Sequence, residues 1–196
     1  YNPIQILIFH YLEIPLVMTS ANLSGQPIIN QNQTAFEKLS SRVDYFCMHD
    51  RKIQQRCDDS VYRIFRHDNY PVRRSRGCAP KCIKLDEELD QHIIAVGGER
   101  KNTFAVGKQN NVWLSQHIGD LENLSTYEFY KNTIQHFEKV FNIDPKIIAH
   151  DLHPDYLSTK FAQDTLQKKG KILYPIQHHH AHAVSCMTEN NLEEPV

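Results

Sequence analysis

The residues best suited to chemistry form a histidine run, in which His178, His179, His180 and His182 surround Ala181. The run follows a predicted strand and opens a predicted helix. Side chains four residues apart share a helix face, so His178 and His182 could present their imidazoles to one metal ion. His179 with His182 is the alternative pair, and solvated helix histidines are the interpretation without a metal. Two histidines need Asp, Glu or water to complete a site, and we expect the missing ligand to lie past the end of the chain.

Two other segments carry side chains suited to anionic oxygens. The turn at residues 20–25 combines hydroxyls, an amide and Gly25 after a predicted buried strand, which suits phosphate or carboxylate oxygens. Residues 73–76 contain three arginines, whose guanidinium groups can bind such oxygens through paired hydrogen bonds. An ordinary polar turn and a solvated basic face are the alternative interpretations.

Three weaker signals lie where strands are expected to end or begin. Asp58 and Asp59 precede a strand, in which neighbouring side chains point to opposite faces, so at most one of them is expected to face a site. Residues 96–103 hold two glycines between strands and could approach a phosphate. His153 and Asp155 leave a strand end and enter a helix, which is where ligands bind in α/β sheets.

The elements that must position these residues follow from apolar periodicity and from capping-box spacing at Thr34–Glu37 and Ser125–Glu128. We predict an α/β chain that contains a β-α-β unit near its end. A composition shift at residues 79–91 predicts a domain boundary near residue 88, with one domain at 1–88 and another at 89–196. Helices are predicted at 5–12, 34–42, 125–141, 156–169 and 178–191, and strands at 15–19, 43–48, 61–65, 93–96, 103–106, 112–115, 146–150 and 171–175.

Composition excludes several classes of protein. The net charge of -1 and the pI near 6.9 provide no general basic surface for nucleic acid. The sequence contains neither a membrane span nor a signal peptide, and five cysteines are an odd number that favours reduced thiols. We therefore expect a cytoplasmic protein. Because the chain begins at Tyr1 and neither end has a polar tail, we expect it to be an internal piece of a larger enzyme.

Taken in order, these segments resemble the HypF family, the carbamoyltransferases of nickel–iron hydrogenase maturation. The resemblance spans nearly the whole chain. The segments that carry it are residues 17–25, 56–61, 73–77, 96–104, 115–121, 151–156 and 177–182.

The resemblance implies two partial domains of the α/β class. The first is the later part of a YrdC-like twisted α/β domain, and the second is the first part of a TsaD-like domain of the actin/Hsp70 type. In this family the first domain makes carbamoyl adenylate from carbamoyl phosphate and ATP. The second domain transfers the carbamoyl group to the C-terminal cysteine of a partner, HypE. Because other family parts, such as the acylphosphatase-like domain, do not match here, we expect the chain to be inactive by itself.

The resemblance also implies roles for individual residues. His178 and His182 would be ligands of a divalent metal, Zn or Fe, and Mg²⁺ would accompany ATP; no catalytic residue is assigned. The alternatives are a tRNA threonylcarbamoyl-type enzyme and a double-stranded-RNA-binding module, the latter supported only by the arginine cluster. The residues expected to line the adenylate pocket are Ser20, Asn22, Ser24, Ser60, Arg73 and Arg76.

Overall fold

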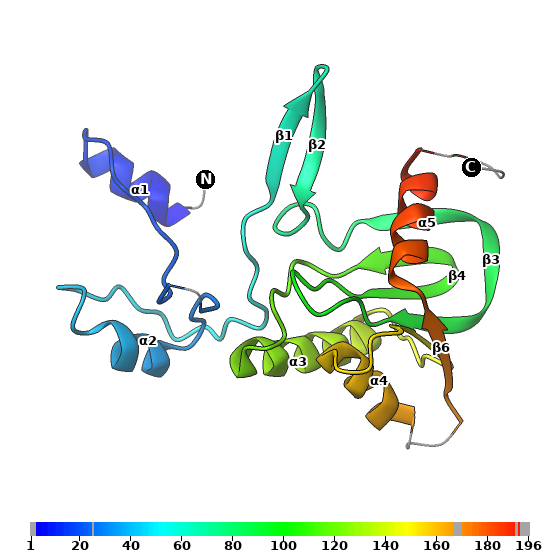
Figure 1. The fold of residues 1–196 in the computed structure, drawn as a ribbon. Helices are drawn as coiled ribbons and strands as arrows, with labels where there is room; N and C mark the ends of the chain where they lie inside the picture. Colours follow the sequence, from blue (N-terminus) through cyan, green and yellow to red (C-terminus); the bar gives the residue numbers. More distant parts are fainter. Residues whose placement is uncertain (1–2, 25, 167–169, 191, 193–196) are drawn as a thin grey trace. The chain divides into compact units, whose positions relative to one another are not determined.

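The computed structural model describes residues 3–24, 26–166, 170–190 and 192. The chain divides into two compact units, Tyr1–Arg51 and Lys52–Val196, which are described separately (Figure 1). No helix in the described residues has the length and apolar content that crossing a membrane requires.

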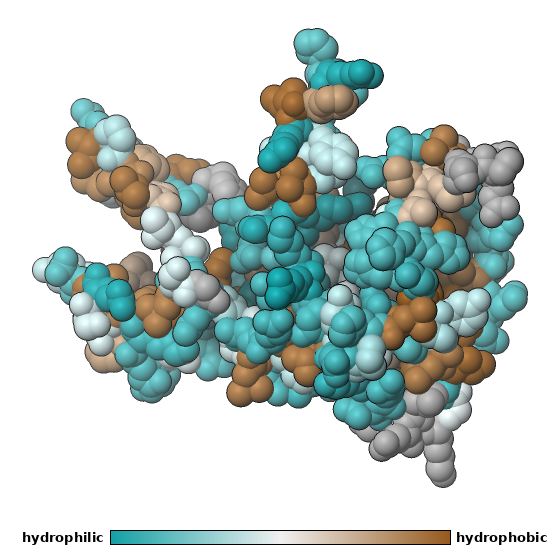
Figure 2. All heavy atoms as spheres, viewed as in Figure 1, coloured by the Kyte–Doolittle hydropathy of each residue, from teal (hydrophilic) through white to brown (hydrophobic). Residues whose placement is uncertain are grey.

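The first unit contains two helices, α1 (Pro3–Tyr11) and α2 (Asn32–Leu39). Figure 2 shows apolar side chains gathered on the surface of α1. Both helices were predicted, but α2 begins before the predicted capping box at Thr34, with Gln31 as its N-cap residue.

The strands predicted at residues 15–19 and 43–48 of this unit are wrong, since neither segment is a strand in the structure. Val17, expected to be buried, is 96% exposed. A strand needs a neighbouring strand for its backbone hydrogen bonds, and the described residues of this unit contain no strand at all. Apolar sequence alone therefore did not produce a sheet there.

The second unit opens with an antiparallel hairpin made of β1 (Val61–Phe65) and β2 (Asp68–Arg73). Its turn residues Arg66 and His67 both have positive φ, 49° and 74°, as in the hairpin turns that match strand twist. The alternation of apolar and polar residues at 61–65 is typical of a half-buried strand, but every side chain of β1 is exposed. The reason is that the hairpin is a separate two-stranded sheet.

A four-stranded sheet in the order β4-β3-β5-β6 forms the frame of this unit. β3 (Cys82–Ala95) and β4 (Ala105–Leu114) are antiparallel, whereas β5 (Ile147–Asp151) and β6 (Ile172–Ile176) extend the sheet in parallel. The three short strands predicted between residues 93 and 115 are corrected to two long ones. Gln109, with φ of 54°, lies within β4 where two separate strands had been expected.

Residue 88 lies inside β3, and the domain boundary near it stays a prediction.

Three helices accompany the sheet: α3 (Leu124–Val140), α4 (Leu157–Leu166) and α5 (His178–Asn190). The Asn123 side chain caps α3 by accepting hydrogen bonds from the Ser125 and Thr126 amides, so the N-cap residue lies two residues before the predicted Ser125. α4 and the strands on either side of it form the predicted β-α-β unit. The ends predicted for these helices at 167–169 and 191 lie outside the described residues.

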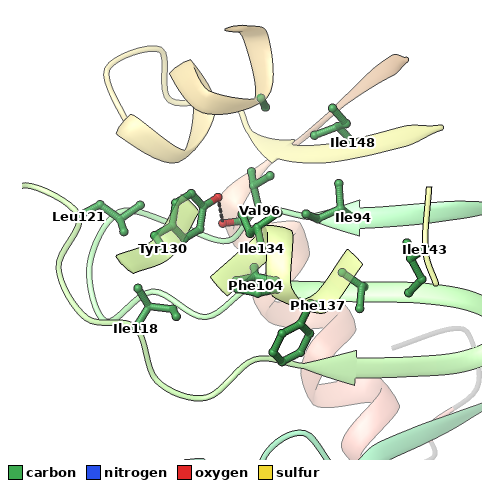
Figure 3. Packing of buried hydrophobic residues seen from close by; sticks show 12 residues of the cluster. Ile94, Val96, Phe104, Ile118, Leu121, Tyr130, Ile134, Phe137, Ile143 and Ile148 are labelled. Atoms are coloured by element: carbon green, nitrogen blue, oxygen red, sulfur yellow. Dashed lines mark hydrogen bonds between the residues drawn. The ribbon is translucent and has the colours of Figure 1, made fainter. Parts of the chain in front are cut away.

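The core lies between α3 and the sheet (Figure 3). Phe104 packs edge-to-face against Tyr130 and Phe137, with ring centroids 6.0 and 4.9 Å apart. The Tyr130 hydroxyl is buried and donates a hydrogen bond to the Val96 carbonyl at 3.0 Å. This packing fixes the end of β3 from which the loop after Val96 departs.

Candidate functional site

Two histidines meet at the start of α5. Because α5 begins directly after β6, His178 and His182 lie one turn apart on one helix face, with their Nε2 atoms 3.1 Å apart and their ring centroids 4.7 Å apart. Two nitrogen ligands of one tetrahedral zinc ion, each at 2.0–2.1 Å, would be about 3.3 Å apart. The observed spacing therefore fits a shared metal ion.

The other two histidines of the run have different surroundings. The backbone amide of His179 donates to the Gln177 side chain at 2.5 Å, and its ring nitrogen lies 3.3 Å from the same oxygen. His180 is exposed. The structure thus brings together the pair spaced by four residues. Among the described residues, no group of three or more His, Cys, Asp or Glu side chains is placed to hold a metal ion.

A carboxylate lies behind the histidine pair. Asp151, at the end of β5, places Oδ2 2.6 Å from Nδ1 of His178, and its Oδ1 accepts the backbone N–H of His153 at 2.9 Å. Burial would raise the pKa of Asp151, but the hydrogen bonds from His153 and His178 outweigh burial and lower it. The carboxylate is therefore ionised and oriented at neutral pH.

A polar cleft of about 860 Å³ opens beside the two imidazoles. One wall is the loop at residues 97–103 and another is the segment at residues 153–157. A smaller pocket of about 300 Å³, lined by Asp151 among others, shares His178 and His182 with this cleft. The histidine pair thus stands where a bound molecule could reach it from solvent.

The loop at residues 97–103, called the glycine loop below, depends on a close approach between two parts of its own backbone. Gly97 has a φ of +74°, and a Cβ there would lie 2.1 Å from the Thr103 carbonyl oxygen. Asn102 is buried, and its Nδ2 donates to the carbonyls of Val96 at 3.0 Å and Gly98 at 2.6 Å. The loop predicted to approach a phosphate is therefore held in one conformation beside His178.

The facing wall is the start of α4. Glu99 is buried, and its Oε2 accepts the Leu157 backbone N–H at 2.6 Å, which caps the helix from a distant loop. His153 stacks on Tyr156 with ring centroids 4.2 Å apart. Asp155 pairs with Lys160 at 3.7 Å and donates its backbone N–H to His153 Nδ1. His153 and Asp155, singled out from the sequence, do line the cleft.

Sequence reasoning missed Asp151 and Glu99 as individual residues of this site. Asp151 had a usable signal, since it ends a predicted strand at the sheet edge where ligands bind. Glu99 had none, because its contact with Leu157 joins segments far apart in the sequence.

The second unit also holds three residues of the predicted adenylate pocket. Ser60 Oγ donates to the Arg76 carbonyl at 2.9 Å and accepts the Ser75 backbone N–H at 2.9 Å. The Arg76 guanidinium donates to the Cys57 carbonyl at 3.0 Å. Ser60 and Arg76 are therefore brought together, and Arg73 stands exposed at the end of β2.

The remaining predicted residues, Ser20, Asn22 and Ser24, lie in the first unit. Ser20 Oγ hydrogen-bonds to Asn22 Oδ1, and the Asn22 amide donates to the Leu23 and Gln26 carbonyls at 3.1 and 3.0 Å. Ser24 is exposed, and Gly25 lies outside the described residues. Hydrogen bonds from the side chains of Ser20 and Asn22 therefore stabilise this turn from within.

Residues 88–189, over half of the chain, match a family model described as the HypF Kae1-like domain. This chain belongs to the HypF family. A second family model, for Sua5, YciO and YrdC proteins and described as telomere recombination, matches residues 1–75. The family resemblance seen in the sequence is confirmed.

Curated HypF relatives match along the whole chain. Carbamoyltransferase HypF2 of Cupriavidus necator is 38% identical over 215 residues, which cover 100% of this chain and 26% of that protein. Carbamoyltransferase HypF of Synechocystis is 37% identical over 99% of this chain and 25% of its own length. The chain therefore spans about a quarter of the length of these relatives.

Solved HypF structures show the same fold. A crystal structure of full-length HypF in the phosphate- and nucleotide-bound form matches with a TM-score of 0.89 and 42% identity, covering 100% of this chain and 30% of that one. The structure of T. kodakarensis HypF gives a TM-score of 0.80 at 41% identity, over 90% of this chain and 23% of the other. The predicted α/β fold, a YrdC-like part followed by a TsaD-like part, is confirmed, and the family model that matches the second part describes it as Kae1-like.

Proposed function

We propose that this chain is part of a carbamoyltransferase of nickel–iron hydrogenase maturation. The enzyme would use carbamoyl phosphate and ATP to make carbamoyl adenylate, and would pass the carbamoyl group to the C-terminal cysteine thiol of HypE. The names of the curated relatives support the carbamoyltransferase activity. The five cysteines, all of them free thiols, support a reducing, cytoplasmic location.

The observation that carries the proposal at the site is the convergence of His178 and His182 on one point at the edge of the cleft. Imidazole nitrogen suits either Zn or Fe, and the 3.1 Å spacing fits a shared ion. When bound, the metal would supply a Lewis acid for the carbamoyl oxygen.

The cleft residues would bind and orient the carbamoyl donor. Gly98 lets a ligand approach the backbone, because it carries no side chain and a Cβ there would meet only His178 at 3.9 Å. Arg100 and Lys101 line the same cleft and would attract the phosphate of an adenylate. His178 lines the same cleft.

We also propose that Ser60, Arg73 and Arg76, with Ser20, Asn22 and Ser24, bind the adenylate while it forms. Hydrolysis of carbamoyl phosphate by another part of the enzyme would first release carbamate and inorganic phosphate. An oxygen of carbamate would then attack the α-phosphorus of Mg²⁺-bound ATP, which joins carbamate to AMP and expels pyrophosphate. Guanidinium groups stabilise the negative charge on these oxygens. The solved HypF in a nucleotide-bound form supports the use of a nucleotide.

Metal binding is tested with Zn²⁺ or Fe²⁺ alone and the 196-residue chain, by isothermal titration calorimetry. We expect His178→Ala and His182→Ala each to abolish measurable binding, with His180→Ala as the matched control that binds normally. Equal binding by all three variants would refute the histidine pair as the metal site.

The adenylation step is tested in a full-length HypF relative that carries this segment in place of its own. We expect carbamoyl-phosphate-dependent ATP–pyrophosphate exchange, and its loss on Arg76→Ala. Arg63→Ala, on the exposed hairpin, is the matched control and should exchange normally. Normal exchange by the Arg76 variant would exclude this residue from the adenylate pocket.

A further inference from the structure

We propose that Asp151 is the positioning residue of the histidine pair: it holds the proton of His178 on Nδ1 and so turns Nε2 toward the metal position. This inference rests on the proposed metal site. The observation behind it is the 2.6 Å contact between Asp151 Oδ2 and His178 Nδ1, made by a carboxylate that is only 10% exposed.

The carboxylate is itself fixed in place. Asp151 pairs with Ile176 in the register of β5 and β6, so the strand end that carries it adjoins the strand that leads into α5. Its Oδ1 accepts the His153 backbone N–H at 2.9 Å, and its carbonyl accepts the Thr159 hydroxyl at 3.1 Å. The Asp151 side chain therefore cannot turn away from His178 without losing its hydrogen bond from the His153 backbone N–H.

The contact dictates which nitrogen of His178 can bind a metal. An ionised carboxylate only accepts hydrogen bonds, and a neutral imidazole has a single N–H, so the proton of His178 belongs on Nδ1. The lone pair is then on Nε2, the atom that lies 3.1 Å from Nε2 of His182. Carboxylates that orient metal-binding histidines in this manner also raise the basicity of the ligand.

The same geometry shows that Asp151 would not be a third ligand of the metal ion. Asp151 approaches the Nδ1 edge of His178, whereas an ion shared with His182 must lie on the Nε2 edge. Both carboxylate oxygens already have hydrogen-bond partners. Asp151 acts on the ion through His178.

The decisive variant is Asp151→Asn, which preserves size. The side chain of the variant has one oxygen, which can replace only one of the two carboxylate oxygens. If that oxygen keeps the hydrogen bond from the His153 N–H, the NH₂ group of the side chain faces Nδ1 of His178. The proton of His178 then moves to Nε2 and blocks the metal position. We expect Zn²⁺ affinity, measured by chelator competition, to fall 10- to 100-fold. Asp164→Asn is the matched control, because Asp164 is an exposed carboxylate on α4, away from the residues that line the cleft, and it should bind Zn²⁺ normally.

A spectroscopic measurement separates positioning from simple loss of structure. In metal-free protein labelled with ¹⁵N-histidine, long-range ¹H–¹⁵N correlation should show His178 protonated on Nδ1 in the native chain and on Nε2 in Asp151→Asn. An unchanged tautomer, or Zn²⁺ affinity equal to that of Asp164→Asn, would overturn the inference. If the native chain binds no Zn²⁺, the proposed metal site fails, and the tautomer alone decides the role of Asp151.

Discussion

Arg56 makes a contact that should contribute measurably to the stability of the second unit. Its guanidinium carbon lies 4.2 Å above the centroid of the Phe129 ring on α3, and its Nη2 donates to the Ser125 carbonyl at 3.0 Å. Burial lowers the pKa of Arg56, and the nearby Asp58 opposes that shift. The charge is therefore partly removed from water, where attraction between a cation and an aromatic ring is stronger.

The expected magnitude follows from these two contacts. A cation over an aromatic ring contributes about 0.5–2 kcal/mol, and a hydrogen bond from a charged donor about 1.5–3 kcal/mol. Since Arg56 is only half-buried, we expect Arg56→Met, which retains most of the aliphatic stem, to destabilise the chain by about 2 kcal/mol. Of this, about 1 kcal/mol should be coupling to the Phe129 ring.

The assay is urea unfolding of the native chain, Arg56→Met, Phe129→Leu and the double variant. The double-mutant cycle isolates the pairwise free energy. Arg100→Met is the control, because Arg100 forms an exposed ion pair with Glu122 at 3.7 Å and should change stability by less than about 0.5 kcal/mol. A coupling free energy below about 0.3 kcal/mol would refute the role assigned to the Arg56–Phe129 contact.

Two further predictions concern the loops around the site. Gly97→Ala should lower the free energy of unfolding by roughly 2 kcal/mol or more, because the added Cβ would meet the Thr103 carbonyl oxygen at 2.1 Å and the φ of this residue is +74°. Urea unfolding measures this change. A loss below about 0.5 kcal/mol would contradict the prediction. Burial, together with the charge of Arg73, lowers the pKa of His117. The stability that His117 contributes is therefore complete above its unfolded pKa of about 6.5 and is lost as pH falls towards its folded pKa. An NMR titration should find that pKa below 6.5 and raised by Arg73→Gln; no response to Arg73→Gln would contradict the arrangement.

The sequence predicted best those elements whose signals are local. The helices α3, α4 and α5 and the strands β5 and β6 follow from apolar periodicity, and the pairing of His178 with His182 follows from helix spacing alone. Strands that depend on a distant partner could not be judged in this way, which is why residues 15–19 and 43–48 were predicted wrongly.

The parts of the site that escaped prediction depend on long-range contacts. Asp151 reaches His178 only because β5 and β6 pair in register, and Glu99 reaches Leu157 only because the glycine loop folds back over α4. Such contacts join segments tens of residues apart, and no local spacing records them. Side chains with obvious chemistry could therefore be found from the sequence, but not the groups that orient them.

The segment that follows Arg51 has a consequence for how this protein can be divided. The YrdC-type family match extends to residue 75, yet the second compact unit already begins at Lys52. Gln55 and Arg56 hydrogen-bond to α3, and Arg74 accepts the His117 backbone N–H. A cut at the end of the family match would therefore sever a folded unit. A chimera of two HypF proteins that keeps this unit intact would join them before Lys52, so that residues 52–75 stay with the second half.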